Sequence, residues 1–399
     1  MKRLDPFSGI PGFVFSGVAA GLKKNGVRDL GLILAKRPCT AAGVYTKNRV
    51  KAAPVFICRE RLQKGSLQAV LVNSGNANAC TGKQGLRDAR TSCRDLAAQL
   101  NIRPGLVAPC STGVIGVPLP AAKITNALPK LIRHASPAMV SDFAEAIMTT
   151  DTFPKIVAFQ DTVMGETVRV CGIAKGAGMI MPDMATMLAF ILTDAAVDPT
   201  LLSKLLTTCT EETFNRISVD GDMSTNDTVL ALAGGADSTA IKHGNTKKAT
   251  VLAELMQAVM HELALQIVRD GEGASKLITI DVTNARNKAE ALMAARQVAN
   301  SLLVKTAFFG EDFNWGRILG ALGCSGATFD MFKVAVFFND IPAVKNGQGI
   351  NENLRALKKT VKQKDIRVRI NLKAGSCRAE VATCDIGYEY VKINAEYTT

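Results

Sequence analysis

Aromatic residues are scarce in this chain of 399 residues, making up 5% of it, and Trp315 is the single tryptophan. Proteins that bind single-stranded nucleic acid stack the bases on aromatic side chains, so this scarcity argues against such a surface. The net charge is +13, but the lysines and arginines form only short pairs and no block of five or more. We therefore favour an enzyme that attracts carboxylate substrates over a nucleic-acid-binding protein.

The histidines and cysteines are not arranged as a catalytic triad, a zinc site or a redox dithiol would require. The three histidines, His134, His243 and His261, lie outside the glycine-rich and polar motifs of the chain, which gives a Ser-His-Asp triad little support. The ten cysteines include no Cys-x-x-Cys pair, so the sequence supports neither a zinc site nor a redox dithiol. We expect most cysteines to be buried small residues in a reduced cytoplasm.

Long hydrophobic runs are also absent. The N-terminal residues 1–7 are not followed by the apolar core of a signal peptide, and no run reaches the length that spans a bilayer. Apolar residues make up 47% and charged residues 21% of the chain, as in a soluble globular protein. These features predict a cytoplasmic protein without membrane contact, long enough for a sizeable core.

The most informative stretch runs from Lys175 to Leu192. It begins as a glycine-rich loop, passes through Ala185-Thr186, and ends in an apolar run that predicts a buried strand. A threonine at this junction suits a nucleophile, because the strand fixes its backbone and the loop leaves room for substrate. Its base would be its own α-amine, which Thr186 gains only if the bond to Ala185 is cut. An ordinary turn before a strand is the alternative interpretation.

The same stretch closely resembles the processing-site motif of the ornithine acetyltransferase family, the glutamate N-acetyltransferases or bifunctional proteins of arginine biosynthesis. Other blocks resemble the family in the same order along the chain; they are residues 109–116, 148–155, 215–227, 270–276, 314–318 and 390–399. The resemblance implies an α+β fold of layered sheets and helices. It also implies one folding unit that self-cleavage divides into an α chain, residues 1–185, and a β chain, residues 186–399, which commonly assemble as an α2β2 heterotetramer.

The resemblance further implies roles for single residues. Thr186 is the nucleophile, and Thr112 and Gly113 form the oxyanion hole. The positions that contact substrate are Thr152, Lys175, Thr186, Glu272, Asn394 and Thr399. No metal or cofactor is implied, although some family members use acetyl-CoA as an acetyl donor. Ala177 and Met181 stand where the family commonly has a serine and a small residue, and they could slow the cleavage between Ala185 and Thr186.

Taken without the resemblance, several of these positions have plainer interpretations. Thr112-Gly113 is an ordinary turn, Thr152 belongs to a segment that caps or turns the chain, and Glu272 is a turn acid between two glycines. The polar tail, residues 394–399, is expected to fray.

Two polar loops also lack an assigned role. The amide-rich loop, residues 73–78, is equally consistent with a turn and with a lining of the site. The acidic loop, residues 218–227, lacks the spacing of a calcium-binding EF-hand, so we expect a self-bonded loop near the site and no catalytic metal.

Together these observations predict acetyl transfer from N2-acetyl-L-ornithine to L-glutamate through an acetyl-threonine, in the cyclic pathway of arginine biosynthesis. The alternatives are an N-terminal-nucleophile amidase or aminopeptidase of similar fold, in which water replaces glutamate, and an inactive basic binding protein.

The hydrophobic pattern predicts the secondary structure. Strands are predicted over residues 27–35, 42–46, 67–72, 156–164, 168–173, 187–192, 277–282, 333–338, 366–372 and 377–384. Helices are predicted over residues 83–100, 120–133, 138–149, 199–215, 247–268 and 288–301.

Overall fold

The computed structural model describes residues 1–6, 9–181, 187–235, 240–242 and 246–396. Three of the predicted site residues, Ala185, Thr186 and Thr399, lie outside the described residues. The other predicted site residues lie within these ranges; they are Thr112, Gly113, Thr152, Lys175, Glu272 and Asn394.

The N-terminal part of the chain builds a mixed sheet. Its strands are β1 (Lys2–Arg3), β2 (Phe13–Val18), β3 (Leu30–Tyr45), β4 (Ser66–Asn73), β5 (Val107–Ser111), β6 (Lys155–Val163), β7 (Glu166–Lys175), β8 (Leu188–Thr193) and β10 (Thr228–Ala233). They follow the order β1-β6-β7-β8-β10-β3-β4-β5, and β2 pairs with β3 beside this path. The apolar run after the predicted cleavage site is therefore the interior strand β8, antiparallel to β7 and parallel to β10.

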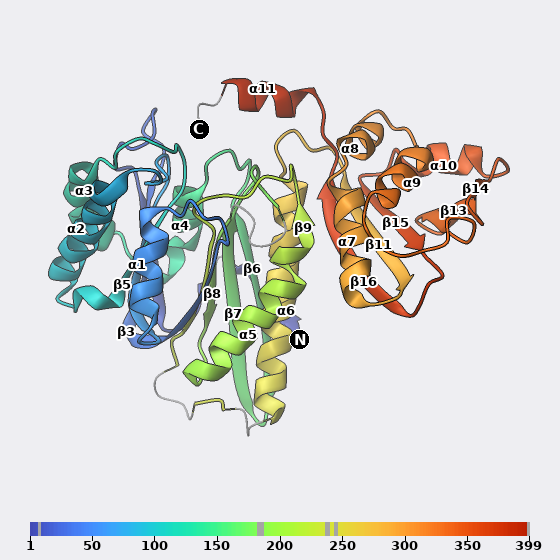
Figure 1. Cartoon of the computed structure of the whole chain (residues 1–399). Helices are drawn as coiled ribbons and strands as arrows, with labels where there is room; N and C mark the ends of the chain where they lie inside the picture. Colours follow the sequence, from blue (N-terminus) through green and yellow to red (C-terminus); the bar gives the residue numbers. More distant parts are fainter. Residues whose placement is uncertain (7–8, 182–186, 236–239, 243–245, 397–399) are drawn as a thin grey trace.

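Helices cover both faces of this sheet (Figure 1). On one side α5 (Pro199–Glu212) and α6 (Thr246–Arg269) pack against the strands, and on the other α4 (Val140–Ile147) packs against β2 and β3. Phe143 of α4 meets Phe190 of β8 edge-on, with ring centroids 5.4 Å apart. Around β5 lie α1 (Ala53–Leu62) and α2 (Gly82–Leu100), and α3 (Ala121–Arg133) packs on α2. The core thus encloses β8 from both faces.

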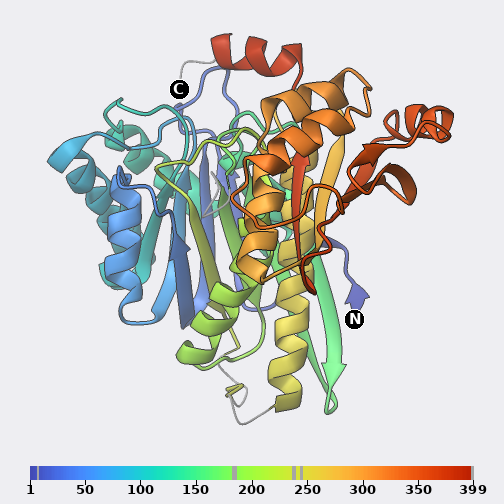
Figure 2. The same cartoon turned by 45° about the vertical axis from the view of Figure 1, so that its right-hand side comes forward.

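A second sheet lies beside the first and belongs to the C-terminal part (Figures 1 and 2). Its strands are β9 (Ile217–Ser218), β11 (Leu277–Ala285), β12 (Ala335–Phe338), β13 (Ile341–Lys345), β14 (Gln348–Gly349), β15 (Asp365–Asn371) and β16 (Cys377–Cys384), in the order β14-β13-β12-β15-β11-β16-β9. The accompanying helices are α7 (Lys288–Ala299), α8 (Leu302–Phe309), α9 (Trp315–Gly323) and α10 (Leu354–Thr360). This α+β arrangement of layers confirms the predicted fold class.

The described part of the chain ends in α11 (Tyr388–Glu396), which lies across the top of the molecule in Figure 1. None of its described side chains is buried. Residues 394–396 continue this helix, and residues 397–399 lie outside the described part of the chain.

The helix α6 is long and apolar enough to cross a membrane by length and composition, since an 18-residue window within residues 247–269 has a mean hydropathy of 1.4. The core helix of a globular fold passes the same test, so this helix is weak evidence for a membrane span. Half of that window is buried inside the fold, where Leu252, Val259 and Leu263 are fully enclosed. Packing against β6 and β7 accounts for this apolar face without a membrane.

Most of the predicted elements are present, and the cysteine prediction is confirmed, since seven of the ten are buried and all ten are free. The two strands predicted over 27–35 and 42–46 are one strand, β3, which continues through a register shift between Leu34 and Cys39. The hydrophobic pattern predicts neither α1 nor β10, because both are short and neither shows a clear hydrophobic period.

Candidate active site

The loop that leaves β7 at Lys175 passes between several segments that carry polar side chains. The amide of Gly176 donates to Asp151 Oδ1 over 2.6 Å, and the carbonyl of Ala177 accepts from the amide of Glu272 over 3.0 Å. Residues 182–186 follow, outside the described part, and the chain resumes at Met187. We call residues 175–181 the cleavage-site loop, because the predicted cut lies just beyond them.

The turn that carries Thr112 and Gly113 follows β5 directly. The amide of Thr112 donates to the carbonyl of Asn73 over 3.0 Å. Gly113 has φ of +130°, and a Cβ at this position would lie 2.4 Å from the carbonyl carbon of Gly75. Only glycine fits this turn, so its backbone conformation is set by the close approach of residues 75–76.

The amide-rich loop, residues 73–78, uses its side chains to bond the backbone. Asn73 Nδ2 donates to the Asn76 carbonyl, and Asn78 Nδ2 donates to the Gly85 carbonyl, each over 2.9 Å. Asn226, beside β10, donates to the carbonyls of Ala77 and Ser111 over 2.7 and 2.8 Å. These bonds favour the turn interpretation, and they fix the backbone on which Thr112 stands.

Lys175 is a buried cation beside that turn. Its Nζ donates to Thr149 Oγ1 over 2.7 Å and to Thr112 Oγ1 over 3.3 Å. Asp151 Oδ2 lies 3.8 Å from the same nitrogen. Burial lowers the pKa of Lys175, against the opposing effect of Asp151. The structure thus brings two predicted site residues, Thr112 and Lys175, into contact.

Asp151, Lys155 and Asp270 form a buried ion network next to Thr152. Lys155 Nζ lies 2.7 Å from Asp151 Oδ1 and 2.5 Å from Asp270 Oδ2, and the Lys155 side chain is fully buried. Asp270 also accepts from the amide and the hydroxyl of Thr152. Burial alone would raise the pKa of Asp151, but Lys175, Lys155 and the Gly176 amide hold it well below its usual range. The network therefore fixes the main chain at both Thr152 and the cleavage-site loop.

Glu272 approaches the loop from the other side. Its side chain is buried, and a Cβ on Gly178 would lie 2.5 Å from its carboxyl carbon. Its Oε2 accepts from Asn394 Nδ2 over 2.7 Å. The structure thus brings the predicted residues Glu272 and Asn394 together, although Asn394 stands on the otherwise exposed helix α11.

Two carboxylates of the acidic loop, residues 218–227, hold the chain before and after residues 182–186. Asp220 accepts from the amides of Met179 and Ile180 over 2.6 and 2.9 Å, and Asp227 accepts from the amide of Met187 over 3.0 Å. Burial raises the pKa of Asp220 to about 6 and that of Asp227 well above its ordinary range. The loop is bonded to neighbouring backbone, as expected, and nowhere in the described residues do three potential ligands gather as a metal site requires.

Sequence reasoning missed the residues that support the site, among them Asp151, Lys155 and Asp270. One signal was available, since Lys155 opens a strand of apolar residues and has Asp151 four positions before it. A cation in that place needs a buried anionic partner. The bond to Asp270, 115 positions further on, could not be read from the sequence.

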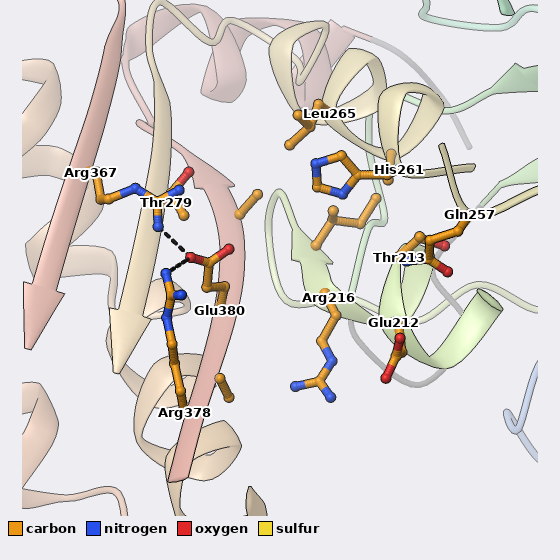
Figure 3. A pocket seen from close by; sticks show the side chains of 14 residues that line it. Glu212, Thr213, Arg216, Gln257, His261, Leu265, Thr279, Arg367, Arg378 and Glu380 are labelled. Atoms are coloured by element: carbon orange, nitrogen blue, oxygen red, sulfur yellow. Dashed lines mark hydrogen bonds and ion pairs between the residues drawn. The ribbon is translucent and has the colours of Figure 1, made fainter. Parts of the chain in front are cut away.

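A separate cavity of about 360 Å³ lies between α5, α6 and the second sheet (Figure 3). None of the predicted site residues that the structure describes is among those that line it. Its arginines Arg367 and Arg378 both bond to Glu380 and Asp281. Its charges are therefore largely satisfied within the protein, and we assign the chemistry to the region around the cleavage-site loop.

Comparisons with known proteins agree with the resemblance. The arginine biosynthesis bifunctional protein ArgJ of Geobacter sulfurreducens is 48% identical over 391 residues, covering 98% of this chain and all of the relative. The protein of the same name from Desulfotalea psychrophila is 49% identical over 390 residues, covering 97% of this chain and 99% of the relative. A crystal structure of argJ from Bacillus halodurans matches with a TM-score of 0.50 and 40% identity, covering 52% of this chain and 98% of that one.

A family model described as the ArgJ family matches residues 14–399. Since this match covers nearly the whole sequence and the relatives align over their full length, the chain belongs to the ArgJ family.

Proposed function

We propose that this chain moves an acetyl group from N2-acetyl-L-ornithine to L-glutamate, through an acetyl ester on Thr186. Membership of the ArgJ family makes the chain an acetyltransferase of arginine biosynthesis. The observation that supports the detailed reaction is the path of the cleavage-site loop. It runs from Lys175, which contacts Thr112, to Gly178, where an added Cβ would meet the Glu272 carboxylate, and it precedes Thr186 in the sequence.

The reaction requires a first cut that frees the amine of Thr186. The Thr186 hydroxyl attacks the carbonyl carbon of Ala185, the carbon–nitrogen bond breaks, and the hydroxyl proton passes to the nitrogen. Water then hydrolyses the ester, which leaves a carboxylate on Ala185 and a free amine on Thr186. The solved chain from Bacillus halodurans supports this step, because 98% of it matches only 52% of this chain, about the length of one fragment.

Acetyl transfer then proceeds in two steps. The Thr186 amine takes the hydroxyl proton, and the oxygen attacks the acetyl carbonyl of acetylornithine. The Thr112 amide already donates to Asn73, so the Thr112 hydroxyl and the Gly113 amide donate to the developing oxyanion, and one such donor contributes about 3–4 kcal/mol. Ornithine leaves with the proton, and the amine of glutamate attacks the acetyl ester in the reverse sequence. Donor and acceptor share an α-amino-acid skeleton, so one pocket serves both.

Charged groups around the loop suit such substrates. Glu272 offers a buried carboxylate to a substrate ammonium, and Asn394 already orients that carboxylate. Lys175 offers a point charge to a substrate carboxylate. We assign the remaining substrate contacts to Thr152 and Thr399.

We further propose a cytoplasmic α2β2 assembly, without a metal or organic cofactor, and acetyl-CoA as a second acetyl donor. The assembly is measured by the molar mass of the native protein in solution. The second donor is tested with radiolabelled acetyl-CoA and glutamate, which should give labelled acetylglutamate in the absence of acetylornithine.

Intact mass under denaturing conditions tests the central proposal. We expect two fragments divided between Ala185 and Thr186, and a gain of one acetyl group on the C-terminal fragment after brief exposure to acetylornithine. Thr186→Ala should give one uncut, inactive chain. A cut and active Thr186→Ala protein would remove Thr186 from the mechanism. Consumption of acetylornithine at the same rate with and without glutamate would indicate an amidase instead.

A further inference from the structure

The helices α1 and α2 border a cavity that the proposed reaction does not use (Figure 1). The cavity has a volume of about 720 Å³ and also contacts the turn at residues 104–105. Five basic side chains and one acidic side chain line it; they are Arg61, Lys64, Arg87, Arg90, Arg94 and Glu60. We call these six residues the arginine cavity. Their excess of positive charge attracts anions.

The helix α2 contributes three of the arginines from one face. Arg87, Arg90 and Arg94 follow one another at intervals of three and four residues, which places them on the same side of a helix. Glu60 pairs with Arg90 over 2.7 Å, and Asp95 Oδ1 lies 3.6 Å from Arg94 Nε. These two carboxylates leave most of the positive charge around the cavity unmatched.

Arg61 distinguishes this cavity from an ordinary basic surface. Its side chain is half-buried, and within the described part of the chain its Nε and Nη1 atoms are buried without a hydrogen-bond partner. Burial raises the pKa of the Cys93 thiol to about 12 and Arg61 acts against this rise, so the guanidinium lies near that thiol. The C-terminal end of α1 favours a cation through the helix dipole, but it does not supply the missing acceptors. A buried charge without a counter-ion is unfavourable, and a bound anion would compensate it.

We propose that the arginine cavity binds the phosphate group of a small anion, with Arg61 as its central ligand. An arginine offers parallel N–H donors to two phosphate oxygens and stays charged at physiological pH. Because Arg61 already lines the cavity, a change of its rotamer turns these donors toward the ligand. The other arginines neutralise the remaining negative charge of a phosphate. None of the lining residues is aromatic, which disfavours a nucleic-acid strand as the occupant.

The arginine cavity is separate from the candidate active site. Ala53, the first residue of α1, donates its amide to the Asn78 carbonyl of the amide-rich loop, which supports the turn at Thr112. Arg61 follows eight residues later, which is about 12 Å along a helix. The phosphate ligand is therefore distinct from the substrates of the proposed reaction, and the inference does not depend on that reaction.

Calorimetric titration of the full chain with pyrophosphate tests the proposal. Arg61→Met removes the charge and keeps a long side chain. The matched control is Arg355→Met, the same change at an exposed residue of α10. We expect Arg355→Met to bind as the wild type does, and Arg61→Met to bind at least about tenfold more weakly, as the loss of one charge-assisted hydrogen bond implies. Pyrophosphate should also raise the melting temperature of the wild type more than that of Arg61→Met.

Equal affinities in the three proteins would mean that the net charge of the chain attracts the anion without a site, and would overturn the inference. Absence of binding at millimolar pyrophosphate, or binding of a DNA oligonucleotide that pyrophosphate does not displace, would also overturn it. Adenosine diphosphate separates the two sources of a phosphate group. An affinity above that of pyrophosphate identifies a nucleotide, and an equal or lower affinity identifies an inorganic anion; each supports the site if Arg61→Met weakens it.

Arg61→Met is expected to fold, because an apolar side chain in place of an uncompensated buried charge is often neutral or stabilising. If it does not fold, Arg94→Met serves as a second variant, since Arg94 is exposed on α2. It should weaken pyrophosphate binding about threefold, as the loss of an exposed charge implies. An unchanged affinity in Arg94→Met would then contradict the proposed site.

Discussion

At the scale of single residues, the contribution of the buried cation Lys155 to stability can be tested directly. It contacts both Asp151 and Asp270 and is itself fully buried. Lys155→Met leaves two buried carboxylates without their cation, so we expect a loss of about 3–5 kcal/mol in the free energy of unfolding. Urea unfolding in the uncut Thr186→Ala background measures it on a single chain.

The control for Lys155 is the exposed ion pair between Arg90 and Glu60. Arg90→Met should cost less than about 1 kcal/mol, because solvent screens the pair. Similar losses for the two variants would show that the buried network does not stabilise the fold.

Asp220 makes stability depend on pH. Its pKa in the folded protein is raised from 3.8 to about 6 by burial, so the folded state binds the proton more tightly than the unfolded chain does. The contribution of Asp220 to stability should therefore be greatest below pH 4, decline as the pH rises from about 4 to about 6, and remain lower above that. The decline amounts to about 2–3 kcal/mol.

Asp220→Asn cannot ionise and should lack this decline, whatever its effect on the absolute stability. Urea unfolding at several pH values between 4 and 7, again in the uncut background, measures the difference. The exposed Asp222→Asn should keep the decline of the parent. If stability changes with pH in the same way in Asp220→Asn and in the parent protein, burial does not raise the pKa of Asp220.

Residue positions differ in how far the sequence could predict them. The family resemblance assigns roles to Thr112, Lys175, Glu272 and Asn394. It assigns none to Asp227, although this residue ends one of the resembling blocks, and the bond from Met187 to Asp227 spans 40 positions of chain. Long-range bonds of this kind depend on which strands become neighbours, and the local sequence does not encode that.

At the scale of elements, the close packing of the cleavage-site loop on Glu272 predicts a specific defect. A methyl group on Gly178 would lie 2.5 Å from the Glu272 carboxylate, the mobile end of a side chain. Gly178→Ala should therefore displace the carboxylate without unfolding the loop. We expect KM for acetylornithine to rise about tenfold, equivalent to about 1.4 kcal/mol, with a smaller change in kcat.

Gly105→Ala is the matched control, because a methyl group there meets nothing within 4 Å. It should leave KM unchanged. If Gly178→Ala also leaves KM unchanged, Glu272 does not bind the substrate.

Periodic elements were well predicted, and those shaped by their neighbours were not. The helix expected over 83–100 is α2, and the strand expected over 67–72 is β4. The strand β3 could not be recognised as continuous, because Lys36-Arg37-Pro38 interrupts its apolar pattern with exposed residues. The helix α11 has no buried side chain, so no hydrophobic face marked it in the sequence.

At the scale of the whole molecule, the proposed cut falls within one sheet. Before it lie β1 to β7, and after it lie β8 and β10, which pair with β7 and β3. Hydrogen bonds and the apolar core therefore join the fragments across the cut. We expect residues 1–185 and 186–399 to elute together in gel filtration under native conditions.

The same fragments should separate only in denaturant, in a single transition followed by circular dichroism. Fragments that part in native buffer would contradict this pairing of strands. The uncut Thr186→Ala chain serves as the control for the elution volume.

The interior position of β8 also implies that the proposed cleavage reports whether a molecule has folded. The hydrogen bonds from the Met179 amide to Asp220 and from the Met187 amide to Asp227 form only when the chain folds. Before that, a newly made chain cannot place the Thr186 hydroxyl next to the carbonyl of Ala185. The proposed cleavage must therefore come after folding. The ratio of cut to uncut bands on a denaturing gel of whole cells would then count the molecules that have folded, for any variant that retains Thr186, without an activity assay.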